Sequence, residues 1–579
     1  MDKAPQAAMM NTASHYFLEG LNEIGLEYLF CNLGTDHAPL IEEMARWNRE
    51  GLAFPKTILC PHENVAMHMA GAYAMMTGRG QGVMVHVDAG TANAAMATHN
   101  LYRARAPVLL MAGRSPFAIH GELPGGRDSY VHFVQDPYDQ ASLVRPYVKW
   151  EYTLRTGVTT KETLRRAHTM MQSDPRGPVY LMLPRETLAE RWNANEVCSY
   201  PDARYGAVAA GGTDPDNVRA LADRLLAAKA PLLITAYAGH NPGTVAVLDE
   251  LARFAGIRVI EFNPIHVNIP QDSPCFAGQM PGKHVAEADV GLLVDVDVPW
   301  LPKFTPENPE TFWAHIDVDV VKHAFPMWGF ANDMRIAGDS GRILAQLLQE
   351  LKARATPEFR EAAAKRVAAL AMERDARLRE AAQLAADRGA PGRINPNYLC
   401  AELGRVIGPE DVVINEGIRN AAAVANQVPR TRPGTLLGLA GGGLGFSGGM
   451  ALGAKLAKPE RMVVQFVGDG GFYFCTPAAV YAVAKQYGLP ILTVVMDNSG
   501  WAAVKEATLR MYPEGEAKAG ARYQARLAPD MNFAKVAEAA GGYGEMVSDP
   551  ADIPAAIERC INEVRGGRSA VLHARVTPI

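Results

Sequence analysis

Short apolar runs alternate with helical patterns along most of the chain, and the clearest case lies near its C-terminal end. Residues 462–467 and 491–496 are rich in β-branched side chains and have the length of strands. The segment between them, 476–486, opens with Thr-Pro and predicts a helix. This order predicts two parallel strands of one sheet. Asp469 and Asn498, which follow the strands, should then lie together at the carboxyl edge, where open α/β sheets bind ligands.

The same alternation recurs upstream and predicts three domains. Further strand-like runs lie at 57–60, 83–87, 108–111, 179–183, 231–235, 258–261, 290–294 and 315–318. An Ala-, Glu- and Arg-rich stretch, 357–388, has helical spacing and ends at a stop signal of Gly and Pro. We therefore expect an α/β fold of three domains, each a mainly parallel sheet flanked by helices. The predicted ranges are 1–192 for the first domain, 205–350 for the middle domain, 357–390 for a connecting helix and 391–579 for the third domain.

Length and composition fit a large globular protein. A chain of 579 residues exceeds what one core supports, and 48% hydrophobic residues suffice to fill several cores. The net charge of −5 is mild, and no basic stripe with interleaved aromatics predicts a nucleic-acid partner. No apolar run is long enough to cross a bilayer, and the first 20 residues lack the apolar core of a signal peptide. Seven scattered cysteines without a CxxC pair indicate reduced thiols, so we expect a cytoplasmic protein.

The residues after the two C-terminal strands have the chemistry of a metal site. One strand is followed by Gly468, Asp469, Gly470 and Gly471, and the other leads to Asn498 and Gly500. A carboxylate, an amide oxygen and a backbone carbonyl of Gly500 are hard ligands, too few to close a cage, which suits Mg²⁺ shared with the phosphates of a ligand. The alternative is a plain turn, because Asp-Gly is common turn chemistry.

A second motif lies near the N-terminus, where Pro61-His62-Glu63-Asn64 follows the run 57–60 and opens a helix. Together with the Gly-Asp-Gly motif, it resembles the thiamine diphosphate (ThDP) enzymes, with acetolactate synthase and benzoylformate decarboxylase as the nearest likenesses. The resemblance extends through nearly the whole chain, although the family usually has Asn-Asn where this chain has Asp497-Asn498. It implies ThDP and Mg²⁺ as cofactors. It also implies an active site between a pyrimidine-binding domain, 1–192, and the diphosphate-binding domain, 391–579, of another subunit, so we expect a homo-oligomer, at least a dimer and by first expectation a tetramer.

The resemblance also assigns roles in the first domain. Glu63 would contact the aminopyrimidine ring and help to activate the cofactor; otherwise it is a carboxylate favoured at a helix start. His86 matches the active-site histidine of benzoylformate decarboxylase, before an Ala-Gly-Thr-Ala-Asn turn that ends at Asn93, a cofactor-site candidate; otherwise it is a hydrogen-bonded histidine at a strand end. Thr35 lies in the turn where relatives carry a pocket serine, or it only forms that turn.

Further candidates lie in the third domain. Glu416 and Gly417 end a strand and would start the diphosphate-side loop. Leu444, beside Gly443, matches the bulky residue that holds ThDP in its bent shape, with core packing as the alternative. A basic stretch from Lys505 to Arg522 resembles a loop over the entrance, where it would hold an anionic group or be only solvated. The roles of His120, His132 and Gln135 stay open.

Two departures limit the resemblance. The stretch 300–304 has no histidine where benzoylformate decarboxylases carry a second catalytic one. The middle domain has Val294-Asp295-Val296-Asp297 where acetolactate synthases carry the Gly-x-Arg that contacts FAD, which argues against bound FAD.

The resemblance implies cleavage or formation of a C–C bond next to a carbonyl. We expect decarboxylation of a 2-oxo acid, with possible ligation of the resulting enamine to an aldehyde or ketone. One alternative is a 2-hydroxyacyl-CoA or oxalyl-CoA lyase, which 414–417 also resembles; the end at Ile579, without the extension that covers CoA in that group, argues against it. A non-catalytic regulatory protein with the same fold is the other, and the presence of Glu63, Asp469 and Asn498 argues against that.

Overall fold

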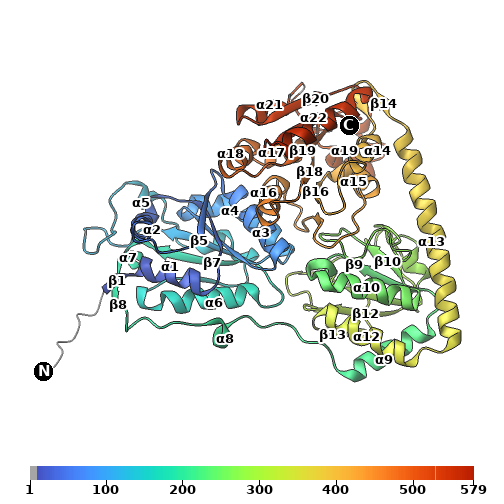
Figure 1. Ribbon diagram of the computed structural model, residues 1–579, viewed down its shortest axis with the longest axis horizontal. Coiled ribbons are helices and arrows are strands. Elements are labelled where there is room, and N and C mark those ends of the chain that lie inside the picture. The colour runs from blue at the N-terminus through green and yellow to red at the C-terminus, as the bar shows by residue number, and fades with distance from the viewer. Residues whose placement is uncertain (1–9, 529, 579) are drawn as a thin grey trace.

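A computed structural model of the protein describes residues 10–528 and 530–578, and three parallel sheets organise it (Figure 1). Residues 1–9, 529 and 579, which fall in the predicted first and third domains, lie outside the described residues. Figure 1 shows the first domain at the left, the middle domain at the lower right and the last domain at the top. The exact domain limits stay a prediction, but the α/β fold with several mainly parallel sheets is confirmed.

The first domain is built on a six-stranded parallel sheet with helices on both faces. In spatial order its strands are β3 (Lys56–Leu59), β2 (Tyr28–Asn32), β4 (Gln81–Val85), β5 (Val108–Arg114), β7 (Val179–Pro184) and β6 (Glu151–Thr153). One helical layer contains α1 (Ala13–Glu23), α2 (Ala38–Glu50), α6 (Thr160–Gln172) and α7 (Arg185–Ala189), and the other contains α3 (Glu63–Thr77) and α4 (Val87–Arg103). Short α5 (Val131–Val134) lies in the connection after β5. The strands are buried on both faces, as expected for parallel sheets covered by helices.

The last domain repeats this strand order. Its strands are β17 (Leu436–Leu437), β16 (Val412–Glu416), β18 (Val463–Gly468), β19 (Leu492–Asp497), β21 (Ala570–Arg575) and β20 (Tyr543–Val547). Its helices are α14 (Pro396–Gly404), α15 (Ala421–Gln427), α16 (Ser447–Ala457), α17 (Asp469–Phe474), α18 (Pro477–Tyr487), α19 (Ala502–Met511), α20 (Glu516–Ala519), α21 (Ala534–Ala539) and α22 (Ile553–Arg565). In both six-stranded sheets the strand order reverses beside the first central strand, at β2/β4 and at β16/β18. Such switch points are where open α/β sheets bind ligands.

The middle domain has a smaller sheet of the same kind. Its strands are β10 (Arg258–Glu261), β9 (Pro231–Thr235), β11 (Val290–Val294), β12 (Phe312–Asp317) and β13 (Met334–Ala337), and its helices are α9 (Pro215–Ala227), α10 (Pro242–Ala255), α11 (His284–Glu287) and α12 (Ser340–Arg354). The long helix α13 (Pro357–Ala386) then runs along the edge of the molecule to the last domain (Figure 1). Two-stranded antiparallel pairs join β1 (Met10–Thr12) to β8 (Arg191–Asn193) and β14 (Gly389–Ala390) to β15 (Arg393–Ile394). Short α8 (Asp202–Tyr205) lies between the first and middle domains.

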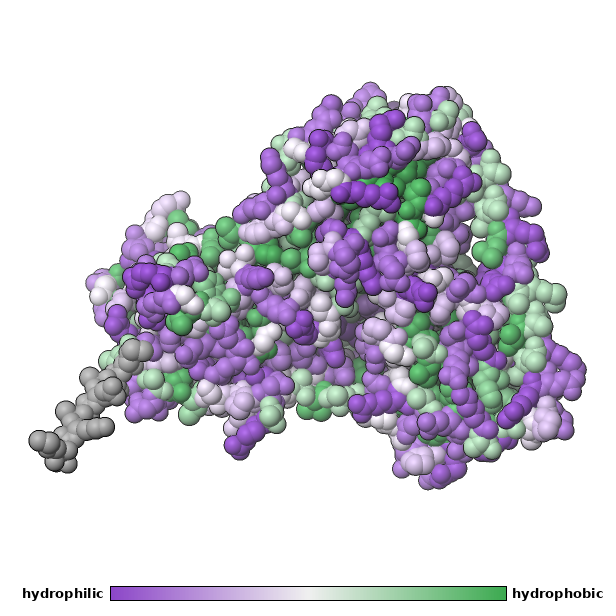
Figure 2. Space-filling model, in the orientation of Figure 1, coloured by the Kyte–Doolittle hydropathy of each residue, from purple (hydrophilic) through white to green (hydrophobic). Residues whose placement is uncertain are grey.

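The first and last domains share one hydrophobic core. Val65 and Met69 of α3 belong to the same buried cluster as Met450 and Ala454 of α16. The two helices therefore pack directly against each other and join the first domain to the last domain. Figure 2 shows a mainly polar surface with small apolar patches on the visible face. Among the described residues, no helix is long and apolar enough to cross a membrane.

Three local predictions were wrong. The strand predicted at 83–87 ends at Val85, because α4 begins at Val87 with His86 as its N-cap residue. The turn expected through Asn93 is accordingly helical, since its small residues fit against the sheet. The basic stretch from Lys505 to Arg522 is mostly helical, in α19 and α20, because its Ala, Lys, Glu and Leu content favours helix.

Candidate active site

The predicted catalytic residues of the first domain meet at the switch point of its sheet. Thr35 begins a 3-10 turn (Thr35–His37) after β2, Glu63 is the first residue of α3, and His86 follows β4. Because β2 and β4 are neighbours, these side chains lie at one carboxyl edge although the sequence separates them widely.

Glu63 is held by two amides. Its side chain is buried, with Oε1 accepting a hydrogen bond from Asn32 Nδ2 at 2.9 Å and Oε2 accepting one from Asn93 Nδ2 at 3.1 Å. The amide of Asn93, predicted to contact the cofactor, therefore orients Glu63. Asn32 is a hydrogen-bonding neighbour of Glu63 that the sequence did not single out; its place at the end of an apolar run was the available signal.

His86 lies between a carboxylate and an amide. Its Nδ1 is 2.5 Å from Asp36 Oδ1, and its Nε2 is 2.9 Å from Gln135 Oε1. The hydrogen bond to Asp36 raises the pKa of His86 above its ordinary value, although burial opposes the shift. Gln135, whose role the sequence left open, thus faces His86, and Asp36 was not recognised as a site residue at all.

The two other open histidines differ in their surroundings. His132 is buried, and its Nε2 is 3.4 Å from Thr35 Oγ1. Burial, together with the charge of Arg185, lowers the pKa of His132. His120 is exposed, and within the described part of the chain its ring makes no hydrogen bond. His132, not His120, therefore joins the wall that contains Thr35.

The predicted metal ligands lie at the edge of the last sheet. Gly468 ends β18, Asp469 with Gly470 and Gly471 opens α17, and Asn498 and Gly500 follow β19. Both Asp469 and Asn498 are buried. Asn498 Oδ1 accepts a hydrogen bond from Gly500 N–H at 3.2 Å, which leaves its second lone pair for another partner.

The electrostatics of Asp469 favour a cation. Burial, and then the nearby charge of Asp497, raise the pKa of Asp469 to about 7. Asp497 is already paired with His573, whose Nε2 is 2.9 Å from Asp497 Oδ2. In the described residues no Lys, Arg or His forms an ion pair with Asp469. A buried carboxylate without a cationic partner, beside an amide oxygen, fits Mg²⁺.

Glu416 faces the inside of its own domain. Its carboxylate accepts hydrogen bonds from the backbone N–H of Gly445, at 2.5 Å, and of Ser447, at 3.0 Å. Burial raises the pKa of Glu416 to about 7 even though these donors lower it. Glu416 therefore holds the turn that carries Gly443 and Leu444, while Gly417 follows it at the end of β16.

Side chains of the first domain clamp the same turn from the opposite side. Asn64 Nδ2 donates to the carbonyl oxygens of Gly445, at 3.0 Å, and Phe474, at 3.2 Å. The amide of Asn100 both donates to and accepts from the backbone of Gly443, with both distances 3.0 Å. The residue next to Glu63 thus touches the turn of Leu444 within one chain. The expected pairing of these domains between two subunits stays a prediction.

A cavity of about 490 Å³ opens beside Asn498. Its lining includes Arg419, Asn420, Lys505 and Glu506. Arg419 pairs with Glu506, while Lys505 reaches the cavity from α19. Of the basic residues in this stretch, Lys505 lines this cavity.

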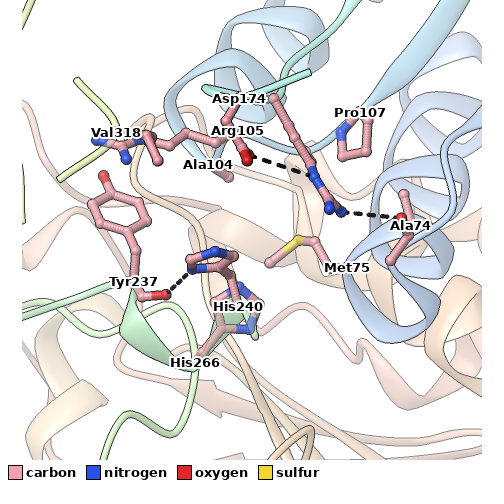
Figure 3. A pocket seen from close by; sticks show the side chains of 13 residues that line it. Ala74, Met75, Ala104, Arg105, Pro107, Asp174, Tyr237, His240, His266 and Val318 are labelled. Carbon is pink, nitrogen blue, oxygen red and sulfur yellow. Dashed lines mark hydrogen bonds and ion pairs between the residues drawn. The ribbon is translucent and has the colours of Figure 1, made fainter. Parts of the chain in front are cut away.

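In the middle domain, the two aspartates at the end of β11 are engaged by neighbouring side chains. Asp297 Oδ1 accepts hydrogen bonds from Arg105 and from Lys322, both at 2.9 Å, and Asp295 accepts one from Ser340. Arg105 and Tyr237, which both donate hydrogen bonds to Asp297, appear in Figure 3 at a small pocket that His240 and His266 also line. Arg105 belongs to the first domain, so its hydrogen bond to Asp297 ties the two domains together.

Comparison with known proteins decides the family. The model of the thiamine pyrophosphate enzyme N-terminal TPP binding domain matches residues 11–143, and that of the C-terminal TPP binding domain matches 419–574. The chain belongs to the thiamine pyrophosphate enzymes. The matches contain Glu63 and His86 in one domain and Asp469 and Asn498 in the other.

Similar proteins fall into three activity groups. Benzoylformate decarboxylase of Pseudomonas aeruginosa is 26% identical over 86% of this chain and 88% of its own length. The acetolactate synthase large subunit of Lactococcus lactis is 25% identical, over 92% and 87%, and 2-hydroxyacyl-CoA lyase of Oryza sativa is 25% identical, over 100% and 97%. Among solved structures, a thiamine diphosphate-dependent 4-hydroxybenzoylformate decarboxylase of Rhodococcus jostii has a TM-score of 0.77 at 21% identity, covering 98% of this chain and 100% of that one. The last likeness shows the shared fold.

Proposed function

We propose that this chain is a ThDP- and Mg²⁺-dependent enzyme that removes CO₂ from a 2-oxo acid and delivers the remaining acyl carbon to a proton or to an aldehyde or ketone. The observation that carries the proposal is the contact between the carboxyl edge of the first domain's sheet and the Leu444 turn of the last domain. A fixed carboxylate, Glu63, and a proton-carrying group, His86, stand at the edge of the first domain. Asn64, next to Glu63, is hydrogen-bonded to the turn of the last domain that carries Leu444.

The donor set fits the cofactor pair. Asp469, Asn498 and the carbonyl of Gly500 would hold Mg²⁺ with the diphosphate, and the turn of Gly443 and Leu444 would support the rings. When bound, ThDP supplies an electron sink next to the carbonyl carbon that loses its carboxylate. The protein supplies binding, orientation and proton handling.

Two side chains would move or hold protons. Glu63, oriented by Asn32 and Asn93, would share a proton with the pyrimidine nitrogen that faces it. His86 would give the proton that completes the aldehyde product from Nε2, the ring nitrogen opposite its bond to Asp36. Thr35 and His132 would line the substrate side with hydrogen-bonding groups.

The relatives support two reaction classes. The name of benzoylformate decarboxylase states the decarboxylation of a 2-oxo acid, and His86 with its two partners suits a step that ends in protonation. The full-length match to 2-hydroxyacyl-CoA lyase supports that lyase as the second candidate. We also propose that the protein is a homo-oligomer. Light scattering should give the mass of a tetramer.

A substrate panel tests the proposal. The protein, loaded with Mg²⁺ and ThDP, is incubated with aliphatic and aromatic 2-oxo acids and with 2-hydroxyacyl-CoA thioesters, and CO₂ and aldehyde are measured. We expect CO₂ from at least one 2-oxo acid, dependent on both cofactors. Cleavage of a thioester with no CO₂ from any 2-oxo acid would replace the proposal by the lyase.

A further inference from the structure

We propose that Asp36 is a positioning residue that orients the imidazole of His86 and keeps a proton on Nδ1, so that Nε2 is the atom presented to substrate. This inference rests on the proton-transfer role of His86 under the proposed function. Asp36 itself is only 1% exposed and would not touch substrate.

The protein leaves space for this pair and for nothing larger. A Cβ atom added to Gly34 would lie 1.9 Å from His86 Nδ1, and one added to Gly113 would lie 1.5 Å from Asp36 Oδ2. Neither contact is possible, so both glycines are needed for the ring and the carboxylate to meet. The second oxygen, Asp36 Oδ2, accepts the backbone N–H of Val87 at 3.3 Å, which fixes the carboxylate plane.

A neighbouring histidine does not compete for the carboxylate. His37 Nδ1 is 3.4 Å from Asp36 Oδ1, but it accepts the backbone N–H of Gly34 at 3.1 Å and therefore carries no proton there. Burial lowers the pKa of His37, which agrees with a neutral ring. Among the described residues, His86 is then the ring that donates to Asp36.

Gln135 suits both protonation states of His86. Its Oε1 lies 2.9 Å from Nε2 and can accept a proton-bearing nitrogen, while a flipped amide would donate to the bare nitrogen. The backbone carbonyl of Gln135 accepts a hydrogen bond from Ser115, which holds the segment in place. His86 can thus gain or lose the Nε2 proton without moving its ring.

Other titratable and charged groups near the pair have weaker effects on His86. Asp88, in the first turn of α4, also raises the pKa of His86, but it ranks behind Asp36 and Gln135. His37 faces Asp36 from its own turn, and His132, with Asp128 and Arg185 beside it, lies on the other side of Thr35. Glu63 projects from α3 toward the start of α4. Asp88→Asn therefore serves as a charge-matched control, because it removes one negative charge near His86 without touching the Asp36 bond.

The test reads the proton of His86 directly and does not depend on turnover. The full chain is treated with diethyl pyrocarbonate between pH 5 and 9, and modification of the peptide that carries His86 is followed by mass spectrometry. In the wild type, we expect the pH at which modification of His86 is half-maximal to lie above the ordinary histidine pKa of about 6.5. This pH is called the modification midpoint below. In Asp36→Asn the midpoint should fall by roughly one pH unit or more, the usual size for loss of an adjacent charge partner. In Asp88→Asn it should fall by less than half of that change.

Activity gives the second readout. If His86 donates a proton, kcat falls as the pH rises through its pKa, so Asp36→Asn should move this falling limb to lower pH by the same amount as the modification midpoint. An unchanged midpoint in a folded Asp36→Asn protein overturns the inference. If that variant does not fold, a wild-type midpoint at or below about 6.5 overturns it instead. If no 2-oxo acid is turned over but the modification midpoint still shifts in Asp36→Asn, the proposed function is rejected and the inference about Asp36 and His86 stands.

Discussion

The substitution Glu63→Gln replaces one carboxylate oxygen by an NH₂ group in the residue next to Asn64, which contacts the last domain. Both oxygens of Glu63 accept from amide nitrogens, Asn32 Nδ2 at 2.9 Å and Asn93 Nδ2 at 3.1 Å. A glutamine has one oxygen and one NH₂ group, so one of the two asparagines must either turn its own amide or face a donor. The side chain is buried, and water cannot easily replace the lost partner.

Two magnitudes follow. A buried donor left without an acceptor costs about 1–3 kcal/mol, so the free energy of unfolding of the cofactor-free protein should fall within that range unless an asparagine flips. Because an amide cannot deliver a proton, exchange of the C2 hydrogen of bound ThDP should slow by roughly 10²- to 10⁴-fold, the usual value of general acid–base catalysis. ThDP and Mg²⁺ binding should persist, since Asp469 and Asn498 are untouched.

The assay is hydrogen–deuterium exchange at C2, stopped by acid and read by NMR. Glu186→Gln is the matched control: it is a buried carboxylate of the same domain, and its Oε1 alone accepts the backbone N–H groups of Phe117, at 2.7 Å, and Ala118, at 2.9 Å. A glutamine keeps that oxygen, so the exchange rate should stay near that of the wild type. Equal rates in Glu63→Gln and wild type would refute the role of Glu63.

Two further predictions concern His86 and Glu416. His86→Ala should leave CO₂ release in the first turnover nearly intact and slow aldehyde release by roughly 10²- to 10⁴-fold, measured by rapid quench; an equal loss of both products would argue against a role after decarboxylation. The pKa of Glu416 is about 7 in the folded protein, above the ordinary 4.5, so its contribution to stability is full below about pH 4.5 and is lost as the pH rises through 7. The unfolding temperature of the cofactor-free wild type, minus that of Glu416→Gln, should therefore fall between pH 4.5 and 8, and a flat difference would contradict this.

Much of the framework was accessible from sequence because apolar runs mark buried parallel strands. The strands β9, β10 and β11 have the predicted limits, and α18 starts at Pro477, the proline of the Thr-Pro pair that was predicted to open this helix. The site of Asp469 and Asn498 was predictable from one βαβ unit, since the strand order alone puts both residues at one edge.

Contacts between distant segments were not predictable in the same way. Asp36 and His86 lie 50 residues apart, and no local pattern tells which acidic residue of a turn meets a histidine after another strand. The clamp of Asn64 and Asn100 on the Leu444 turn joins two domains and depends on how α3 packs against α16. Glu416 was predicted to start the diphosphate-side loop, and the direction of its carboxylate, set by the backbone N–H groups of a later turn, could not be predicted.

The central claim, that Asp469 and its neighbours hold Mg²⁺ and ThDP, is tested most directly by calorimetry. ThDP is titrated into the wild type and into Asp469→Ala, each with Mg²⁺ present. We predict saturable, Mg²⁺-dependent binding to the wild type and no measurable retention of either Mg²⁺ or ThDP by the variant, because the diphosphate charges would lose their bridging cation. Equal ThDP affinity in the two proteins would contradict the claim and leave Gly-Asp-Gly as a helix start without a metal.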